Sequence, residues 1–137
     1  DRFLLADATE RVRRYPNDLQ FRYELGVLLF QNSRLNEAIQ EFQLSQRNPQ
    51  RRTRSLYYLA MCFKAKHQYD IALEQLEKAA SEINIMDETK KDIIYEIGTT
   101  HELMGHQDKA VQNFKEIYSV DISYRDVAAK IEKAYKK

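Results

Sequence analysis

The sequence contains few of the residues that mark tight turns, disulfides or membrane spans. Its 137 residues include three glycines, two prolines, one cysteine and no tryptophan. So few glycines and prolines disfavour a β-rich fold, which needs many tight turns. The single cysteine, Cys62, excludes an intramolecular disulfide and favours a reducing, cytoplasmic compartment. No run reaches the ~18–20 apolar residues of a transmembrane helix, so we expect no membrane span in this segment.

The residues that are abundant are typical of a globular helical protein. The sequence is 43% hydrophobic and 31% charged, which disfavours a disordered chain. Ala, Leu, Glu, Gln, Lys and Arg dominate, and all of them favour helices. No secretion signal opens the sequence. It begins at Asp1 without a methionine, so we expect a piece of a longer protein whose own targeting is unknown.

The charges are balanced overall but not along the chain. The net charge of +1 gives no general attraction to nucleic acid or to an anionic membrane. Residues 1–66 carry 12 Lys and Arg against 7 Asp and Glu, whereas residues 67–137 carry 10 against 14. The basic first half therefore leaves a local nucleic-acid or anionic surface open as an alternative.

Three sets of residues recur along the chain in one register. Leu25-Gly26, Leu59-Ala60 and Ile97-Gly98 are separated by steps of 34 and 38 residues. The same steps separate two further sets downstream: Ala38, Ala72 and Ala110, and Phe42, Leu76 and Phe114. A fixed period of this length is the signature of a repeat architecture.

Each repeat has the pattern of a helical hairpin. Apolar residues three and four apart predict a first helix, a short polar turn follows, and a second apolar stripe predicts a second helix. We expect the second helices to be capped by Asn36, Asp70 and Asp108. We also expect close helix crossings where small residues face each other, with Gly26, Ala60 and Gly98 opposite Ala38, Ala72 and Ala110.

These hairpins resemble the tetratricopeptide repeat (TPR) family, whose unit is a helix–turn–helix of 34 residues. Arg22, His101 and Ile117 depart from the family pattern. The resemblance implies an all-α fold, a right-handed superhelical solenoid of TPR repeats with a C-terminal capping helix. The matching residues are Leu25, Gly26, Leu29, Ala38, Phe42 and Ser45; Leu56, Leu59, Ala60, Phe63, Ala72, Leu76 and Ala79; and Ile94, Ile97, Gly98, Ala110 and Phe114.

We predict a single TPR domain over residues 1–137. Its parts are the second helix of a preceding partial unit (1–16), repeat 1 (17–50), repeat 2 (51–86), repeat 3 (87–120) and a capping helix (121–137). Asp87 is expected to cap the first helix of repeat 3, which would begin at Glu88. The capping helix is expected over Ser123–Tyr135, with Ser123 and Asp126 as a capping box and an apolar stripe that ends at Tyr135.

The sequence shows no set of catalytic residues. His101 and His106 enclose a glutamate as in a zinc-protease motif, but they stand five apart instead of four. On a continuous helix they would point about 140° apart, and we expect Gly105 to end that helix. Cys62 lies in an apolar helical stretch, where a thiol acts as a small hydrophobic group. We therefore expect no enzyme, no catalytic residue, no cofactor and no metal.

The resemblance implies a concave groove lined by the first helices of the repeats. Tyr23, Tyr57 and Tyr95 occupy the same position in successive repeats, and tyrosine is favoured at binding surfaces. Packing between repeats would explain the tyrosines equally well. The expected groove residues are Tyr23, Val27, Phe30, Arg54, Tyr57, Tyr58, Met61, Lys64, Asp92, Tyr95, Glu96, Thr99 and Glu102.

From these features we predict a protein–protein interaction scaffold that binds a partner peptide or helix in this tyrosine-rich groove. The alternative is binding of nucleic acid or an anionic surface through the arginine-rich N-terminal half. The partner's identity, the pathway and the oligomeric state stay open. The arginines of the alternative are Arg11, Arg13, Arg14, Arg47, Arg51, Arg52 and Arg54.

Overall fold

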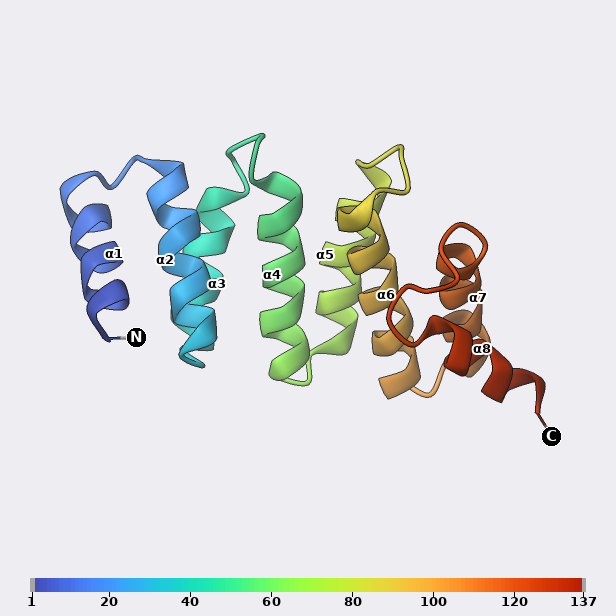
Figure 1. The fold of residues 1–137 in the computed structure, drawn as a ribbon. Coiled ribbons are helices and arrows are strands. Elements are labelled where there is room, and N and C mark those ends of the chain that lie inside the picture. Colours follow the sequence, from blue (N-terminus) through green and yellow to red (C-terminus); the bar gives the residue numbers. More distant parts are fainter. Residues whose placement is uncertain (1, 137) are drawn as a thin grey trace. The chain divides into compact units, whose positions relative to one another are not determined.

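The computed structural model describes residues 2–136, which form helices joined by short turns, with no strand in this part of the chain (Figure 1). The predicted all-α fold is therefore confirmed. The helices are α1 (Arg2–Arg14), α2 (Leu19–Gln31), α3 (Leu35–Ser45), α4 (Arg52–Ala65), α5 (Tyr69–Ser81), α6 (Glu88–Leu103), α7 (Gln107–Tyr118) and α8 (Val127–Tyr135).

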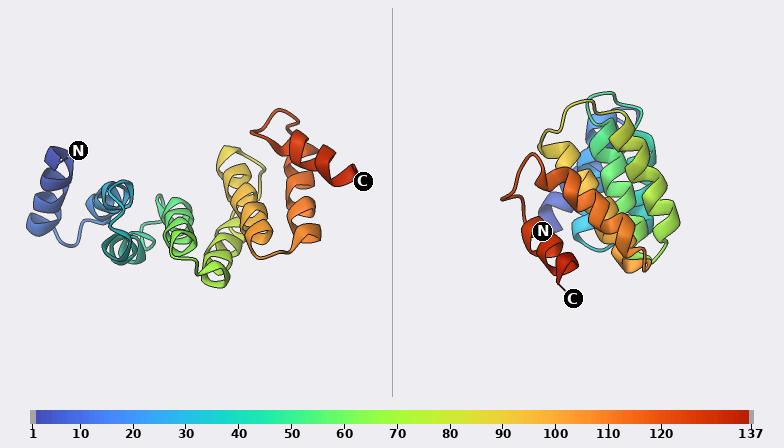
Figure 2. Two further views of the ribbon diagram at one scale, coloured as in Figure 1. Left: turned by 90° about the horizontal axis from the view of Figure 1, so that it is seen from below. Right: turned by 90° about the vertical axis from the view of Figure 1, so that its right-hand side faces the viewer.

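The chain divides into two compact units, Asp1–Gln75 and Leu76–Lys137, and α5 begins in the first and ends in the second. The first unit contains the hairpin of α2 and α3, flanked by α1 and α4. The second contains the hairpin of α6 and α7, with α8 packed on α7 (Figure 2). The single domain and the repeat boundaries stay predictions.

Aspartates cap the first helices of both hairpins. The carboxylate of Asp18 accepts a hydrogen bond from the Phe21 N–H at 3.0 Å, and that of Asp87 accepts one from the Lys90 N–H at 2.8 Å. Both bonds satisfy an amide that has no partner within its helix. The predicted cap at Asp87, with α6 beginning at Glu88, is thus confirmed.

The predicted N-cap positions of the second helices are wrong, although the Asp70 carboxylate accepts a hydrogen bond from the Ile71 N–H at 2.9 Å in the first turn. Asn36, Asp70 and Asp108 are each the second residue of their helix, because α3, α5 and α7 begin one residue before them. A residue inside the first turn no longer occupies the N-cap position. Asp70 and Asp108 still place negative charge in the first turn, which the helix dipole favours, and Asn36 accepts a hydrogen bond from the Lys66 ammonium.

The chain forms a further hairpin from α4 and α5. The first helices of the three hairpins, α2, α4 and α6, end in the same turn, the Schellman motif. One residue adopts a left-handed conformation, with φ of 60° at Ser33, 62° at His67 and 80° at Gly105. The next residue donates its N–H to the carbonyl five positions back in the sequence. These bonds run from Arg34 to Leu29 (2.9 Å), Gln68 to Phe63 (2.9 Å) and His106 to His101 (2.8 Å).

The α2–α3 hairpin and the α6–α7 hairpin each cross where a glycine receives a phenylalanine ring. A Cβ atom added at Gly26 would lie 2.8 Å from the Phe42 ring, and one added at Gly98 would lie 2.6 Å from the Phe114 ring. Both rings are fully buried. Ala38 and Ala110 are buried as expected, but the space at the glycines is filled by rings rather than by these alanines, which corrects the prediction.

The closing helix covers the core of the second unit but is shorter than predicted. It begins at Val127, and Ser123 is not its cap, because the Ser123 hydroxyl and N–H both donate to Asp121. The apolar stripe ends earlier too, since Tyr135 is 71% exposed. The core that α8 completes consists of Ile94, Ala110, Phe114, Ile117, Tyr124, Val127 and Ile131.

Candidate binding surface on the first helices

The predicted groove residues of the first unit lie on α2 and α4 and form an aromatic cluster. The Tyr58 ring stacks on Phe42 with 5.1 Å between centroids and an angle of 5° between planes. The edges of Phe30 and Tyr57 meet Tyr58 at 5.6 and 5.4 Å, and Tyr23 meets it at 6.1 Å. Tyr23, Val27, Phe30, Arg54, Tyr57, Tyr58, Met61 and Lys64 are all half-buried.

The hairpin crossing positions this cluster. Because Gly26 has no side chain, Phe42 reaches between α2 and α3, and its other face is available to Tyr58 of α4. The aromatic surface thus rests on a ring that cannot move without opening the core. α3 and α4 also meet through two buried hydroxyls, those of Ser45 and Ser55, which lie 2.7 Å apart. We therefore expect a rigid surface.

Two arginines lie over tyrosine rings of the same surface. The guanidinium carbon of Arg51 is 5.1 Å from the centroid of Tyr23, and that of Arg54 is 4.9 Å from the centroid of Tyr57. Both distances fall within the range of a cation–π interaction. Arg51 is also held by a 2.9 Å hydrogen bond from its Nε to Gln20. Burial raises the pKa of Tyr23, as does the Tyr58 hydroxyl, and the two arginines oppose this rise.

Four of the five predicted groove residues of the second unit, which all lie on α6, contact residues 124–130, the closing segment. The Tyr124 hydroxyl donates to Asp92, and Arg125 donates to Asp92 at 3.2 Å. The Arg125 guanidinium lies 4.8 Å from the Tyr95 ring and 3.6 Å from the carboxylate of Glu96, which is buried. In this unit the predicted positions therefore take part in packing against the closing segment.

Two more polar contacts connect α6 with the closing segment. The Tyr95 hydroxyl donates to Asp126 at 2.7 Å, and the Lys130 ammonium donates to Glu102 at 3.0 Å. The pKa of Tyr95 lies well above its ordinary value, because the ring is desolvated and its hydroxyl bonds to a carboxylate. Thr99, half-buried, donates to the Glu96 backbone carbonyl at 3.2 Å.

Several arginines of the alternative binding surface have carboxylate partners within the first unit. Arg13 and Arg14 both bond to Glu10, whose pKa they lower to about 2, with the Arg13 hydrogen bond the largest cause. Arg11 lies 3.6 Å from Glu24. A phosphate group would have to compete with these carboxylates.

The two histidines that the sequence placed apart lie together. Their Nδ1 atoms are 3.1 Å from each other. The angle of about 140° applies to a continuous helix. The expected end of the helix near Gly105 is confirmed, because α6 ends at Leu103 and Gly105 turns the chain back, so that His106 returns to His101. Burial, His106 and Lys109 together lower the pKa of His101, with burial the largest cause. The signal in the sequence was the glycine directly before His106, because glycine favours the left-handed backbone that turns the chain here.

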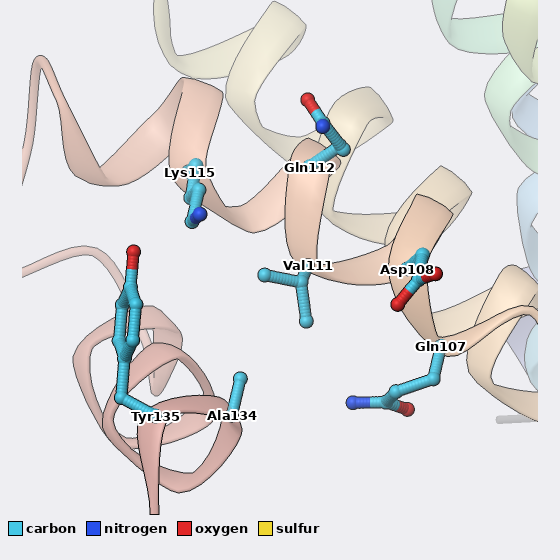
Figure 3. A pocket seen from close by; sticks show the side chains of 7 residues that line it. All are labelled: Gln107, Asp108, Val111, Gln112, Lys115, Ala134 and Tyr135. Atoms are coloured by element: carbon cyan, nitrogen blue, oxygen red, sulfur yellow. The ribbon is translucent and has the colours of Figure 1, made fainter.

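A hollow of the second unit lies away from the predicted residues. A cavity of about 400 Å³ opens between α7 and α8, where Val111 and Ala134 face each other and Lys115 lies 5.1 Å from the Tyr135 ring (Figure 3). Among residues 2–136 no group of three or more His, Cys, Asp or Glu side chains could hold a metal ion. No helix in this range is long and apolar enough to cross a membrane.

No family model matches the sequence, and no curated protein matches it. Solved structures do match the fold. A crystal structure of MamA superposes with a TM-score of 0.82 at 18% identity, over 96% of this chain and 74% of MamA. The type III secretion chaperone SycD of Yersinia enterocolitica, in complex with a peptide of the translocator YopD, gives 0.71 at 18% identity, over 84% of this chain and 90% of SycD.

Kinesin light chain TPR-like repeats from Podosopora anserina give a TM-score of 0.68 at 17% identity, over 85% of this chain and 65% of that chain. At such low identity these likenesses concern the fold. The chain thus has the fold of tetratricopeptide-type repeats, as its sequence predicted.

Proposed function

We propose that the chain is a protein–protein interaction scaffold and that the aromatic surface of α2 and α4 binds a segment of a partner protein. The observation that carries this proposal is the contact network of Tyr23, Phe30, Tyr57 and Tyr58 around the buried ring of Phe42. Tyr23 and Tyr58 pack on the Phe42 ring, Phe30 and Tyr57 pack on Tyr58, and all four rings remain partly exposed. A rigid, partly exposed aromatic surface binds at little entropic cost and is typical of interface centres.

A peptide or helix is the partner that this surface suits best. The SycD structure contains a peptide of YopD, so a protein with the same fold can hold a peptide. Arg54 and Lys64 lie on the same helix as Tyr57 and Tyr58, which would add polar contacts beside the rings. We expect affinity from the aromatic groups and orientation from the charged ones.

The five predicted residues of the second unit are expected to contribute less. Asp92, Tyr95, Glu96 and Glu102 bond to Tyr124, Arg125, Asp126 or Lys130 of the closing segment. A partner that used these groups would have to replace bonds that already exist, and such an exchange yields little net free energy. We therefore assign the centre of binding to the first unit.

The same reasoning favours a protein partner over nucleic acid. Arg11, Arg13 and Arg14 already lie beside carboxylates, so binding of a phosphate at this end would first break intramolecular ion pairs. Arg51 contacts the Tyr23 ring and Gln20, so it is part of the aromatic surface itself.

The proposal can be tested with a peptide selected from a displayed random library on the wild-type chain. Tyr57→Ala should weaken binding of that peptide by about 2 kcal/mol, roughly thirtyfold, because central aromatic residues dominate interfaces. Tyr135→Ala is the matched control, since Tyr135 is an exposed tyrosine of the second unit. Affinities are measured by calorimetry, and circular dichroism checks that each variant is folded.

Equal affinity of wild type and folded Tyr57→Ala would refute the proposed surface. Selection of single-stranded nucleic acid, but of no peptide, would favour the arginine-rich alternative instead.

A further inference from the structure

We propose that His101 and His106 form a two-histidine binding site for a borderline divalent metal ion such as Zn²⁺, Ni²⁺ or Cu²⁺. The site joins the last turn of α6 to the residue that precedes α7. None of its residues belongs to the aromatic surface on α2 and α4. The two histidines would point in different directions on a continuous helix, but their side chains lie next to each other in the structure.

The backbone turn brings the two imidazoles together. In a Schellman motif, the residue that donates the five-position backbone bond lies beside the residue that accepts it, and the two side chains usually make an apolar contact. The corresponding pairs in the other two hairpins are Leu29 with Arg34 and Phe63 with Gln68. In the third hairpin both positions are histidine, so a contact that is normally apolar becomes a contact between two potential ligands.

The distance between the nitrogens suits one shared ion. Two nitrogens bound to one metal at about 2.05 Å lie about 2.9 Å apart at a right angle and about 3.35 Å apart at the tetrahedral angle. The observed Nδ1–Nδ1 distance of 3.1 Å falls between these values. The present contact needs a proton on one Nδ1, and binding needs that ring to carry its proton on Nε2 instead, with no change in net charge.

The surroundings leave room for the ion and its water ligands. His106 is exposed and lines a depression of about 350 Å³ together with Gly105, Gln107, Asp108 and Lys109. Since no third histidine, cysteine or carboxylate completes a cluster among residues 2–136, water would fill the other positions. Lys109 acts against a cation at His101 and Glu77 acts in its favour.

The class of ion follows from the donors. Imidazole nitrogen suits Zn²⁺, Ni²⁺ and Cu²⁺, whereas Mg²⁺ and Ca²⁺ prefer oxygen. A bound ion would connect two helices of one hairpin, and because it binds only when both nitrogens are held together, it would stabilise the folded second unit.

The experiment is a titration of the complete, tag-free chain with Zn²⁺, Ni²⁺ and Mg²⁺ by calorimetry and by thermal unfolding. We expect one Zn²⁺ or Ni²⁺ per chain, a raised melting temperature and no effect of Mg²⁺. His101→Gln and His106→Gln should each weaken binding by at least about tenfold, because two linked ligands bind far more tightly than one. Both variants should lose the metal-dependent rise in melting temperature.

His67→Gln is the matched control, because His67 is the third histidine of the sequence. It lies in the equivalent turn of another hairpin, beside the Tyr69 hydroxyl. It should bind metal as the wild type does. The proposal is overturned if the wild type binds no more tightly than either variant, if only one of the two substitutions weakens binding, or if His67→Gln weakens it equally. Circular dichroism of each variant separates loss of binding from loss of fold.

Discussion

The two units contain the same hairpin but surround it differently. In both, a phenylalanine ring fills the space at a glycine, and an arginine from the next loop lies over a tyrosine of the first helix. In the first unit that tyrosine, Tyr23, lies among other rings. In the second unit the equivalent Tyr95 donates its hydroxyl to Asp126, and the carboxylates near it bond to the closing segment.

The difference shows how one repeat serves two purposes. Hydrophobic burial at the crossing fixes the backbone in both units and does not depend on what lies on the surface. The surface positions are then available for aromatic contacts in one unit and for polar contacts with the closing segment in the other. The recurrence of tyrosine at one position of successive repeats therefore does not imply that each tyrosine has the same role.

The crossings should be equally important in both units. Phe42→Ala and Phe114→Ala should each lower the free energy of unfolding by about 3–5 kcal/mol, because each removes a fully buried ring. Urea denaturation measures both, and Phe3→Ala, at an 82% exposed position, is the control. A loss below about 1 kcal/mol in one unit alone would break the equivalence of the two hairpins.

The glycines at the crossings should tolerate no side chain. Gly26→Ala and Gly98→Ala gain helix propensity of roughly 1 kcal/mol but force a rigid, buried ring to move. We expect a net loss of about 1–2 kcal/mol in each case. Gly105→Ala meets no neighbour, so its cost comes from the left-handed backbone alone and should be about 1 kcal/mol. Stabilisation by Gly98→Ala would contradict the crossing described above.

The two units should differ in how much the hydroxyl of the repeated tyrosine contributes to the free energy of unfolding. Tyr95→Phe removes the bond to Asp126 and should cost about 1 kcal/mol, whereas Tyr23→Phe, whose described contacts are ring contacts, should cost less. The raised pKa of Tyr95 also predicts a pH effect. Above about pH 10 the unfolded chain loses this proton while the folded chain retains it, so stability falls as pH rises.

Tyr95→Phe should reduce this fall at high pH. Chemical denaturation of wild type and variant across the alkaline range measures it, and an unchanged pH profile would show that the hydroxyl of Tyr95 is not held as described.

The last prediction concerns the chemical reactivity of the Cys62 thiol, where we expect the smallest effect. This thiol is fully buried, and burial raises its pKa to about 11. The folded chain should therefore resist alkylation at about pH 8, and the unfolded chain should react at once. Mass spectrometry after iodoacetamide treatment measures this, and rapid labelling of the folded chain would show that the first unit opens readily.

The sequence predicted the hairpins and their buried residues because apolar periodicity and small residues are local signals. It also predicted the short polar turns, but not the left-handed backbone at Ser33 and His67, since only Gly105 has the residue type that favours this conformation. The N-caps of the second helices were predicted two positions too late in the sequence. The N-cap residues of α3 and α7 are Arg34 and His106, and neither makes a side-chain cap bond.

The candidate site was predictable in composition but not in arrangement. The recurrence of Tyr23, Tyr57 and Tyr95 identified the helix face, yet their neighbours come from distant parts of the chain. Asp126 lies 31 residues after Tyr95, and Gln20 lies 31 residues before Arg51. Nothing local indicates such pairs. The contact of His101 with His106 was missed because a helix end expected at Gly105 does not by itself show that the next residue returns to the last turn of the helix.

The most direct test of the proposed function is a titration of the isotopically labelled chain with the selected peptide, followed by ¹H–¹⁵N NMR. The account predicts that the largest chemical-shift changes cluster on α2 and α4, around Tyr23, Tyr57 and Tyr58, with small changes on α8. Changes concentrated instead on the hollow between α7 and α8, around Val111 and Ala134, would contradict it.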